Sequence, residues 1–194
     1  MSASIGDITK QNDYALITGA SSGLGAEFAR QLAAAGRNLI LVARREDRLS
    51  ALAEELRAAF GINCQSIVAD LNEPDAGTQI SGTCVSSGWQ VSWLINNAGV
   101  AGPDLLQDRD WAAQQTFFQL MMLSVADLCH RLIPDMVGRG YGRVINVASV
   151  AARVPRSGGC NYGPTKAYLV ALSEELNLTV AAQGVHVSAL CPGF

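Results

Sequence analysis

The sequence predicts a doubly wound α/β fold, in which helices cover both faces of a parallel sheet. Apolar runs of strand length alternate with longer amphipathic segments along the whole chain. The run at residues 39–43 is continuously apolar, which is typical of a strand buried on both faces. The segments between strands are long enough to cross over between parallel neighbours. We expect a single domain over residues 1–194, because no Pro- or Ser-rich linker, repeat or low-complexity tract interrupts them.

Strands and helices are expected in strict alternation. The pattern predicts strands at residues 14–18, 38–43, 63–69, 92–95, 143–148 and 185–190. It predicts helices at residues 24–35, 46–60, 73–87 and 162–183, and one or two more within 108–139. Gly36, Gly61 and Gly184 each follow or close a predicted helix, where glycine is common because it accepts a left-handed backbone.

Composition excludes several classes of protein. Hydrophobic residues make up 49% of the chain and charged residues 16%, which indicates a globular protein rather than a disordered one. A net charge of -3 gives no reason to expect a nucleic-acid partner. No apolar run approaches the roughly 20 residues that a membrane helix needs, and the first residues lack the features of a signal peptide. We therefore expect a cytoplasmic protein with no membrane partner.

The cysteines are odd in number and widely scattered. They are Cys64, Cys84, Cys129, Cys160 and Cys191, and none forms a pair with metal-type spacing. We expect buried thiols in a reducing compartment, with neither disulfides nor a metal site.

The chain stops at Phe194, directly after the last predicted strand and a Cys-Pro-Gly turn. An open α/β sheet binds its ligand beyond the carboxyl ends of its strands, so Pro192 and Gly193 are expected to lie near the site. We expect the natural protein to continue beyond Phe194 into a segment that lines the substrate site.

A glycine-rich loop joins the first strand to the first helix. It contains Gly19, Ser21, Gly23, Leu24 and Gly25, in the order Thr-Gly-Ala-Ser-Ser-Gly-Leu-Gly. The glycines allow a tight turn and let the backbone approach a pyrophosphate, while the following helix start offers free N–H groups. An ordinary strand-to-helix turn is the alternative. The position after the first strand favours a dinucleotide site.

The spacing TGxxxGxG resembles the cofactor loop of the short-chain dehydrogenase/reductase family. This resemblance implies a Rossmann fold and a nicotinamide cofactor. It also implies a homo-oligomer, a dimer or tetramer, because members of the family usually pair through their long helices.

The tip of the second strand indicates which cofactor is used. A dehydrogenase that uses NAD places a carboxylate there on the adenosine ribose, but this chain has Ala43 followed by Arg44 and Arg45. The Arg44 guanidinium can bind the ribose phosphate of NADP, and Ser21 could add a hydroxyl. The alternatives are that both arginines form a solvated strand end, or that Glu46 is the missing acid. Glu46 falls at a helix start, where a carboxylate is favoured anyway. We expect NADP(H).

Two further strand ends carry residues that match the family. Asp70-Leu71 ends the third strand, and the resemblance implies that the aspartate contacts the adenine; a helix-capping aspartate is the alternative. Asn97, Ala98 and Gly99 follow the fourth strand in the sequence Asn-Asn-Ala-Gly. The resemblance implies that Asn97 braces the sheet and that Gly99 borders the cofactor.

Tyr162 and Lys166 are four residues apart, which places them on one face of a helix. Pro164 is tolerated in the first turn, and Asn161 is expected to cap the helix. A neighbouring ammonium and a positive helix end both favour the phenolate form of tyrosine, so Tyr162 could move a proton to or from a substrate oxygen.

Ser149 ends the fifth predicted strand, thirteen residues before Tyr162. Its order and spacing relative to the glycine loop, the Asn-Asn-Ala-Gly turn and the Tyr-x-x-x-Lys pair resemble the family over essentially the whole chain. The resemblance implies that Tyr162 is the catalytic acid/base, that Ser149 orients the substrate, and that Lys166 holds the nicotinamide ribose. It also places Pro192 and Gly193 beside the nicotinamide.

One position departs from the family pattern. Many members carry an asparagine in the long helix before the fifth strand, where it continues a proton relay from the lysine. This chain has Met121 there, and a thioether is at best a weak hydrogen-bond acceptor. Another group or solvent then serves the relay, or the proton step is slower.

The sequence as a whole predicts an NADP(H)-dependent oxidoreductase that interconverts a ketone or aldehyde and an alcohol. A non-catalytic NADP(H)-binding sensor or scaffold is the alternative, which Met121 favours and the Ser149, Tyr162 and Lys166 set opposes. Epimerisation or dehydration at the same nicotinamide also stays open. The identity of the small-molecule substrate is expected to depend on residues 150–160 and on the segment after Phe194.

Overall fold

A single parallel sheet of six strands organises the protein. The structure is a computed structural model that describes residues 12–155 and 160–193. Strand order across the sheet is β3-β2-β1-β4-β5-β6, and every pairing is parallel. The strands are β1 (Asp13–Thr18), β2 (Asn38–Ala43), β3 (Cys64–Val68), β4 (Gln90–Asn96), β5 (Gly142–Val147) and β6 (Val185–Leu190). The predicted doubly wound α/β fold is confirmed.

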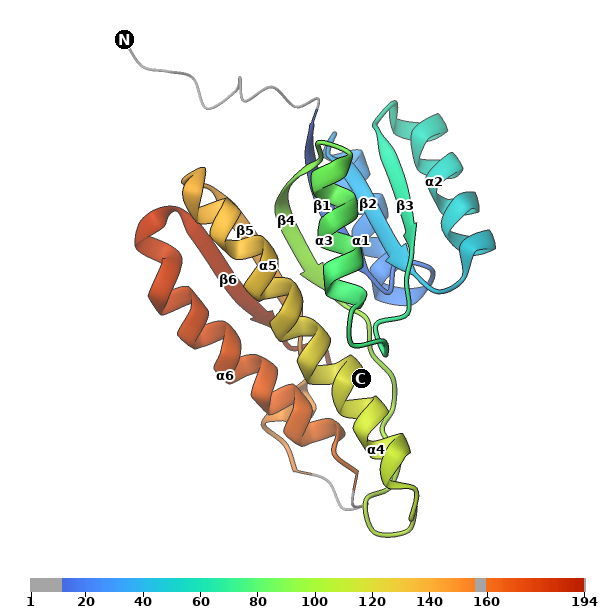
Figure 1. The fold of residues 1–194 in the computed structure, drawn as a ribbon, viewed down its shortest axis with the longest axis vertical. Helices are drawn as coiled ribbons and strands as arrows, with labels where there is room; N and C mark the ends of the chain where they lie inside the picture. The colour runs from blue at the N-terminus through green and yellow to red at the C-terminus, as the bar shows by residue number, and fades with distance from the viewer. Residues whose placement is uncertain (1–11, 156–159, 194) are drawn as a thin grey trace.

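Helices cover both faces of this sheet (Figure 1). Helices α1 (Gly23–Ala34) and α2 (Glu46–Phe60) pack on one face. Helices α3 (Ala76–Ser86), α5 (Ser124–Gly138) and α6 (Tyr162–Val180) pack on the other. Short 3₁₀ turns, η2 (Val150–Ala152) and η3 (Ala181–Gln183), precede and follow α6 in the chain. No described helix is long and apolar enough to cross a membrane.

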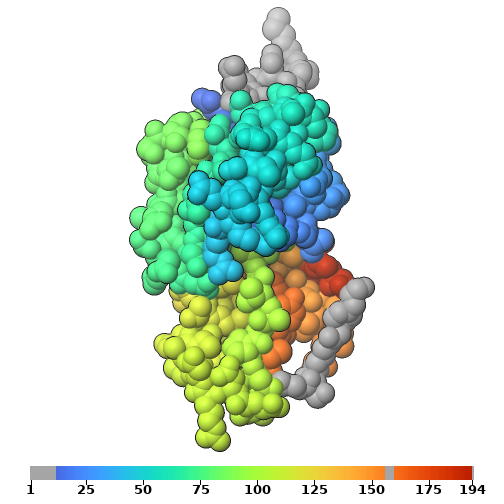
Figure 2. All heavy atoms as spheres, turned by 90° about the vertical axis from the view of Figure 1, so that its right-hand side faces the viewer, coloured from blue at the N-terminus to red at the C-terminus, as the bar shows by residue number. Residues whose placement is uncertain are grey.

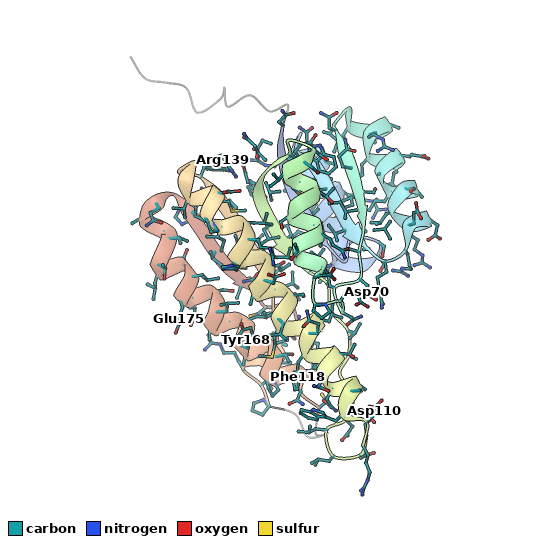
Figure 3. All side chains as sticks on the ribbon, in the orientation of Figure 1. Asp70, Asp110, Phe118, Arg139, Tyr168 and Glu175 are labelled. Carbon is teal, nitrogen blue, oxygen red and sulfur yellow. The ribbon has the colours of Figure 1, made fainter. Side chains whose placement is uncertain are left out.

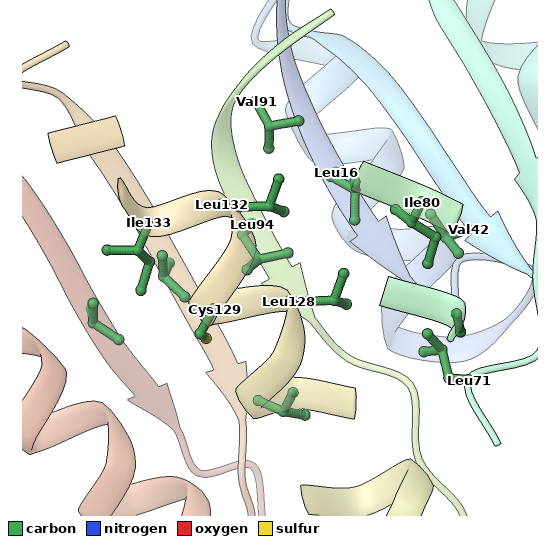
Figure 4. Packing of buried hydrophobic residues seen from close by; sticks show 14 of the residues in the cluster. Leu16, Val42, Leu71, Ile80, Val91, Leu94, Leu128, Cys129, Leu132 and Ile133 are labelled. Carbon is green, nitrogen blue, oxygen red and sulfur yellow. The ribbon is translucent and has the colours of Figure 1, made fainter. Parts of the chain in front are cut away.

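The strand periodicity divides the core into two layers. Alternate residues of β1 point to opposite faces, so Leu16 packs toward α3 and α5 while Ile17 packs toward α1 and α2. Figure 4 shows Leu128 and Leu132 of α5 lying over β4 on the first of these faces, with Leu94 beneath them. Burial of these side chains anchors the long helices to the sheet.

A buried polar ladder joins two central strands to α6. Asn96 Nδ2 of β4 donates to Asn146 Oδ1 of β5 at 2.8 Å. Asn146 Nδ2 donates in turn to Ser173 Oγ of α6 at 2.9 Å. Buried amides that find such partners specify one register, because a shift would leave them unsatisfied. The ladder therefore fixes α6, which begins at Tyr162, against the end of β5.

The one or two helices expected within residues 108–139 form one continuous rod over residues 111–138. Helix α4 (Trp111–Phe118) runs into a π-helix, η1 (Gln119–Leu123), which runs directly into α5. A π-turn inside an α-helix is rare and is frequently found at functional sites. Met121 lies in this turn.

Two predictions about particular residues were wrong: that all five cysteines are buried, and that Ser149 ends a strand. Cys160 and Cys191 are exposed, whereas Cys64, Cys84 and Cys129 are buried as expected. Burial raises the pKa of the Cys129 thiol to about 12, which keeps it protonated and unreactive. Ser149 does not end a strand, since β5 stops at Val147 and Ser149 instead precedes the turn η2.

Candidate cofactor and active site

The carboxyl ends of the strands form the functional edge of the sheet. In Figure 1 the strand arrowheads point to the end of the molecule where α4 lies and α6 begins. In Figure 2, segments from the first half of the chain form one end of the visible surface and segments after residue 100 form the other. Two adjoining cavities, of about 1040 Å³ and about 520 Å³, are lined by residues from both groups. The cavities share Leu24, Asn97, Gly99 and Val100, so they form one continuous recess.

The glycine loop borders the smaller cavity, which we call the cofactor cavity. Gly19 and Gly23 have φ values of +65° and +57°, which favour glycine. A Cβ on Gly19 would lie 2.8 Å from the Cα of Ala98, and one on Gly25 would collide with the carbonyl oxygen of Gly19. Within the described chain, no side chain caps α1, so its first N–H groups are available to a ligand. This cradle suits a pyrophosphate.

Two arginines stand at the tip of β2, and they have different partners. The Arg44 guanidinium lies 3.7 Å from the carboxylate of Asp70. Arg45 Nη2 donates to Ser21 Oγ at 2.8 Å and to Ser22 Oγ at 2.9 Å. Both arginines and both serines line the cofactor cavity. Arg45 was not predicted as a site residue, although two hydroxyls in the loop opposite a double arginine were a usable signal.

Asp70 and Leu71 also line the cofactor cavity, close to the end of β3 (Figure 3). Asp70 Oδ1 accepts from the backbone N–H of Asn72 at 3.0 Å and from its side-chain amide at 2.8 Å. Asp75, and not Asp70, is the residue that precedes α3. The helix-capping interpretation of Asp70 was therefore wrong, since its carboxylate closes a turn at the cavity rim.

Asn97 ties the ends of β4 and β1 together. Its side-chain amide donates to the carbonyl oxygen of Thr18 at 3.0 Å, and its backbone N–H donates to Thr18 Oγ1 at 3.0 Å. The Ala98 N–H donates to the same hydroxyl at 3.1 Å. These bonds hold the Asn-Asn-Ala-Gly turn against the glycine loop. Asn97 and Gly99 consequently line both cavities.

Ser149, Tyr162 and Lys166 all line the larger cavity, which we call the substrate cavity. Tyr162 is the first residue of α6, and Lys166 Nζ lies 5.6 Å from the centroid of its ring. Ser149 Oγ accepts from the Ala151 N–H at 3.1 Å, which fixes the hydroxyl at the start of η2. The structure thus brings together three side chains that the sequence separates by as many as seventeen positions.

Lys166 is almost fully buried, with 4% of its surface exposed. Its Nζ donates to the carbonyl oxygen of Val147 at 2.6 Å. Burial lowers the pKa of Lys166 from its ordinary value of 10.5 to about 8, and nearby Cys191 partly opposes this shift. Near neutral pH the ammonium is therefore charged but readily gives up a proton.

Met121 and Lys166 both lie close to Gly99. Only 1% of Met121 is exposed. Its Sδ accepts weakly from the Val100 N–H at 3.5 Å. A Cβ on Gly99 would lie 3.2 Å from that sulfur and 3.7 Å from Lys166 Nζ. The thioether therefore occupies the neighbourhood in which a relay asparagine was expected.

Asn161 and Pro192 complete the surroundings of the site. Asn161 directly precedes α6, but its side chain does not cap the helix as expected. Asn161 Nδ2 instead donates to Gln114 Oε1 of α4 at 3.2 Å. Pro192 and Gly193 line the substrate cavity, and the Pro192 carbonyl accepts from the Val150 N–H at 3.1 Å. Gln114 was not singled out from the sequence.

Known proteins resemble this chain over most of its length. Residues 13–194 match the family model for short chain dehydrogenases. Sulfoacetaldehyde reductase 2 of Chromohalobacter salexigens is 34% identical over 185 residues, which cover 94% of this chain and 73% of the relative. A short-chain dehydrogenase from Sphingobium yanoikuyae in complex with NADPH superposes with a TM-score of 0.87 at 35% identity, over 93% of this chain and 70% of that one. A bulky-bulky ketone specific alcohol dehydrogenase from Comamonas testosteroni superposes with a TM-score of 0.88 at 31% identity, over 95% and 74% respectively. The chain belongs to the short-chain dehydrogenase/reductase family.

Proposed function

We propose that this protein is an NADP(H)-dependent oxidoreductase that interconverts a ketone or aldehyde and an alcohol. The observation that carries the proposal is the continuity of the two cavities. A glycine-loop cradle opens directly into a cavity lined by Ser149, Tyr162 and Lys166. A dinucleotide laid along the recess would bring its reactive end to these three side chains.

Ser149, Tyr162 and Lys166 have different roles in the proton transfer. Ser149 Oγ, fixed by the Ala151 N–H, orients the substrate oxygen through a hydrogen bond. The Tyr162 hydroxyl gives its proton to that oxygen in reduction and takes it back in oxidation. The buried Lys166 ammonium favours the phenolate that is left behind, and it binds the nicotinamide ribose. The nicotinamide ring supplies or accepts the hydride when the cofactor is bound.

The preference for NADP(H) rests on the charges around the cofactor cavity. Arg44, Arg45 and Ser21 would hold the adenosine ribose phosphate through charge-assisted hydrogen bonds. Because Ser21 and Ser22 already orient the Arg45 guanidinium, little ordering is needed when phosphate binds. Ala43 leaves no carboxylate at the position where NAD enzymes bind the ribose hydroxyls. The NADPH complex of the Sphingobium yanoikuyae relative supports the same preference.

The substrate is a small molecule whose carbonyl carbon carries apolar groups. The wall of the substrate cavity includes Val100, Ala101, Ala151, Ala152 and Val154. Such a wall suits apolar substituents on a ketone or aldehyde. Assembly into a dimer or tetramer through the long helices and a cytoplasmic location stay predictions.

A non-catalytic NADP(H) sensor is a second candidate, and one observation favours it. Met121 stands where a relay group is expected and cannot donate a hydrogen bond. A sensor, however, has no need for a tyrosine and a buried lysine that meet a serine in one cavity. The oxidoreductase is therefore the better-supported function.

The test is oxidation of NADPH and NADH, followed by absorbance, with a panel of apolar and polar ketones and aldehydes. We expect turnover with NADPH, weaker turnover with NADH, and the highest kcat/KM for apolar ketones. Tight NADPH binding with no turnover on any carbonyl compound would instead support the sensor.

A further inference from the structure

Gln114 is a buried amide whose two ends contact different parts of the substrate cavity's surroundings. It lies in α4, which Asp110 caps (Figure 3), and only 1% of Gln114 is exposed. Its Nε2 donates to the carbonyl oxygen of Asp104 at 3.3 Å. Its Oε1 accepts from Asn161 Nδ2 at 3.2 Å. A buried amide is costly unless both ends are bonded, so this side chain is placed specifically between its two partners.

One partner, Asp104, ends the segment 99–104, which we call the wall because its residues 99–102 line the substrate cavity. Gln114, Phe117 and Met121 follow one another at helical spacing and contact this wall at successive points. A Cβ on Gly102 would lie 2.8 Å from the Phe117 ring, and Met121 Sδ accepts from the wall at Val100. Gln114 binds the far end of the wall at Asp104. One face of α4 and η1 therefore supports the wall along its length.

The other partner belongs to the start of α6. Asn161 is the residue before Tyr162, whose hydroxyl we place at the substrate oxygen. A second link joins the same two segments, because Asp104 and Cys160 form an isolated antiparallel bridge. The wall and the beginning of α6 are thus connected by one backbone bridge and one side-chain amide.

We propose that Gln114 is a positioning residue that sets the distance between the 99–104 wall and Tyr162. A ketone resting on the wall then presents its carbonyl oxygen to the Tyr162 hydroxyl. This inference rests on the proposed function, since it assigns to Gln114 the alignment of substrate with the proton donor. Gln114 lines neither cavity, but its two partners lie in segments that border the substrate cavity, so we expect its loss to change substrate turnover more than cofactor binding.

The first test compares Gln114→Leu with Gln115→Leu, which makes the same substitution at the exposed neighbouring position. Hydrogen–deuterium exchange requires no turnover. We expect faster amide exchange in both residues 99–104 and residues 160–163 of Gln114→Leu, and no change in Gln115→Leu. Unchanged exchange in either segment would overturn the proposal.

The second test is kinetic. A misplacement of about 1 Å can cost roughly a hundredfold in rate, so we expect kcat/KM for an apolar ketone to fall by about tenfold to a hundredfold in Gln114→Leu. The dissociation constant of NADPH, measured by fluorescence titration, should stay within about twofold of the wild-type value. A positioning role would be contradicted if Gln114→Leu had the same kcat/KM as Gln115→Leu. It would also be contradicted if NADPH binding by Gln114→Leu weakened by the same factor as kcat/KM.

Asn161→Ala removes only the hydrogen bond from Asn161 Nδ2 to Gln114 Oε1 and leaves Gln114 in place. It therefore tests the connection between Gln114 and the start of α6 if Gln114→Leu folds poorly. We expect it to lower kcat/KM by several-fold, and the double variant to be no worse than Gln114→Leu, because both act through one contact. Additive losses would show that the two residues act independently. Failure of the wild-type protein to reduce any carbonyl compound would overturn the proposed function, whereas the exchange experiment would still decide the link that Gln114 makes.

Discussion

Lys166 Nζ donates a 2.6 Å hydrogen bond to the carbonyl oxygen of Val147, the last residue of β5. The bond joins α6 to the strand that leads into Ser149, so it holds the lysine and the serine side of the site in one arrangement. It is the one hydrogen bond described for an ammonium that has three donors. The same Nζ lies near Gly99, since a Cβ on that glycine would be 3.7 Å away, and the proposed function places the cofactor ribose in this neighbourhood.

Burial of Lys166 makes the stability of the protein depend on pH. Its pKa is about 8 in the folded chain and 10.5 ordinarily, so between these values the unfolded chain binds more protons. The contribution of Lys166 to the free energy of unfolding therefore rises as pH increases from 8 to 10.5. Below pH 8 the destabilisation caused by burying the charged ammonium is fully present.

Replacing Lys166 by Met removes this dependence. We expect the free energy of unfolding of wild type, relative to Lys166→Met, to increase by about 2 kcal/mol between pH 7 and pH 10. Urea denaturation of both proteins at each pH measures the difference, and titration of the groups that do not interact with Lys166 cancels in the comparison. A difference that does not change with pH would show that Lys166 is not buried as described.

Arg45 provides a test of cofactor preference. Arg45→Ala removes a guanidinium that Ser21 and Ser22 orient, so we expect the KM for NADPH to rise by about tenfold to a hundredfold, the value of a lost charge-assisted hydrogen bond. The KM for NADH should change little. Arg48→Ala, at an exposed position of α2, is the matched control. Equal effects of Arg45→Ala on both cofactors would count against a phosphate-binding role.

Met121 provides a test of the proton path. A thioether does not carry a proton, and leucine has a similar volume, so Met121→Leu should leave kcat and its pH profile within about twofold of wild type. Stability should fall by at most about 1 kcal/mol, because the weak bond to the Val100 N–H is lost. Stopped-flow rates across pH 6–9 provide the comparison. A kcat lowered by more than tenfold would assign the sulfur a direct part in the reaction.

Much of the fold follows from local pattern. The strands at residues 38–43 and 185–190 have the bounds that were predicted. The first is a largely apolar run bounded by Arg37 and Arg44, and the second lies between Gly184 and the Cys191-Pro192 turn. Tyr162 and Lys166 could be placed on one face of a helix because residues four positions apart are neighbours on a helix surface. The glycine loop was recognisable because only glycine fits at Gly19 and Gly25.

What could not be predicted depends on contacts between distant residues. Gln114 and Asn161 are 47 positions apart, and their bond exists only once α4 and α6 are packed. The partner of Arg45 depends on which way a long side chain turns at a strand end. Cys160 and Cys191 were expected to be buried because the cysteines are odd in number and widely scattered, but both are exposed. The π-turn around Met121 lies within a long helical rod, and the helical pattern of the sequence does not mark it.

Tyr162 is the residue on which the account depends most, and its matched control lies on the same helix. Tyr168 is a second tyrosine of α6 (Figure 3), and it packs on the core instead of lining the substrate cavity. Tyr162→Phe and Tyr168→Phe each remove one hydroxyl and keep the ring. Measuring NADPH binding by each variant checks that the cofactor cavity is intact.

The most direct measurement is therefore NADPH-dependent reduction of an apolar ketone by wild type, Tyr162→Phe and Tyr168→Phe. General acid catalysis contributes roughly a hundredfold to ten-thousandfold, and we expect kcat to fall by that amount in Tyr162→Phe and to stay within about twofold of wild type in Tyr168→Phe. Tyr162→Phe with wild-type kcat would contradict the assignment of Tyr162 as the proton donor, and with it the central claim.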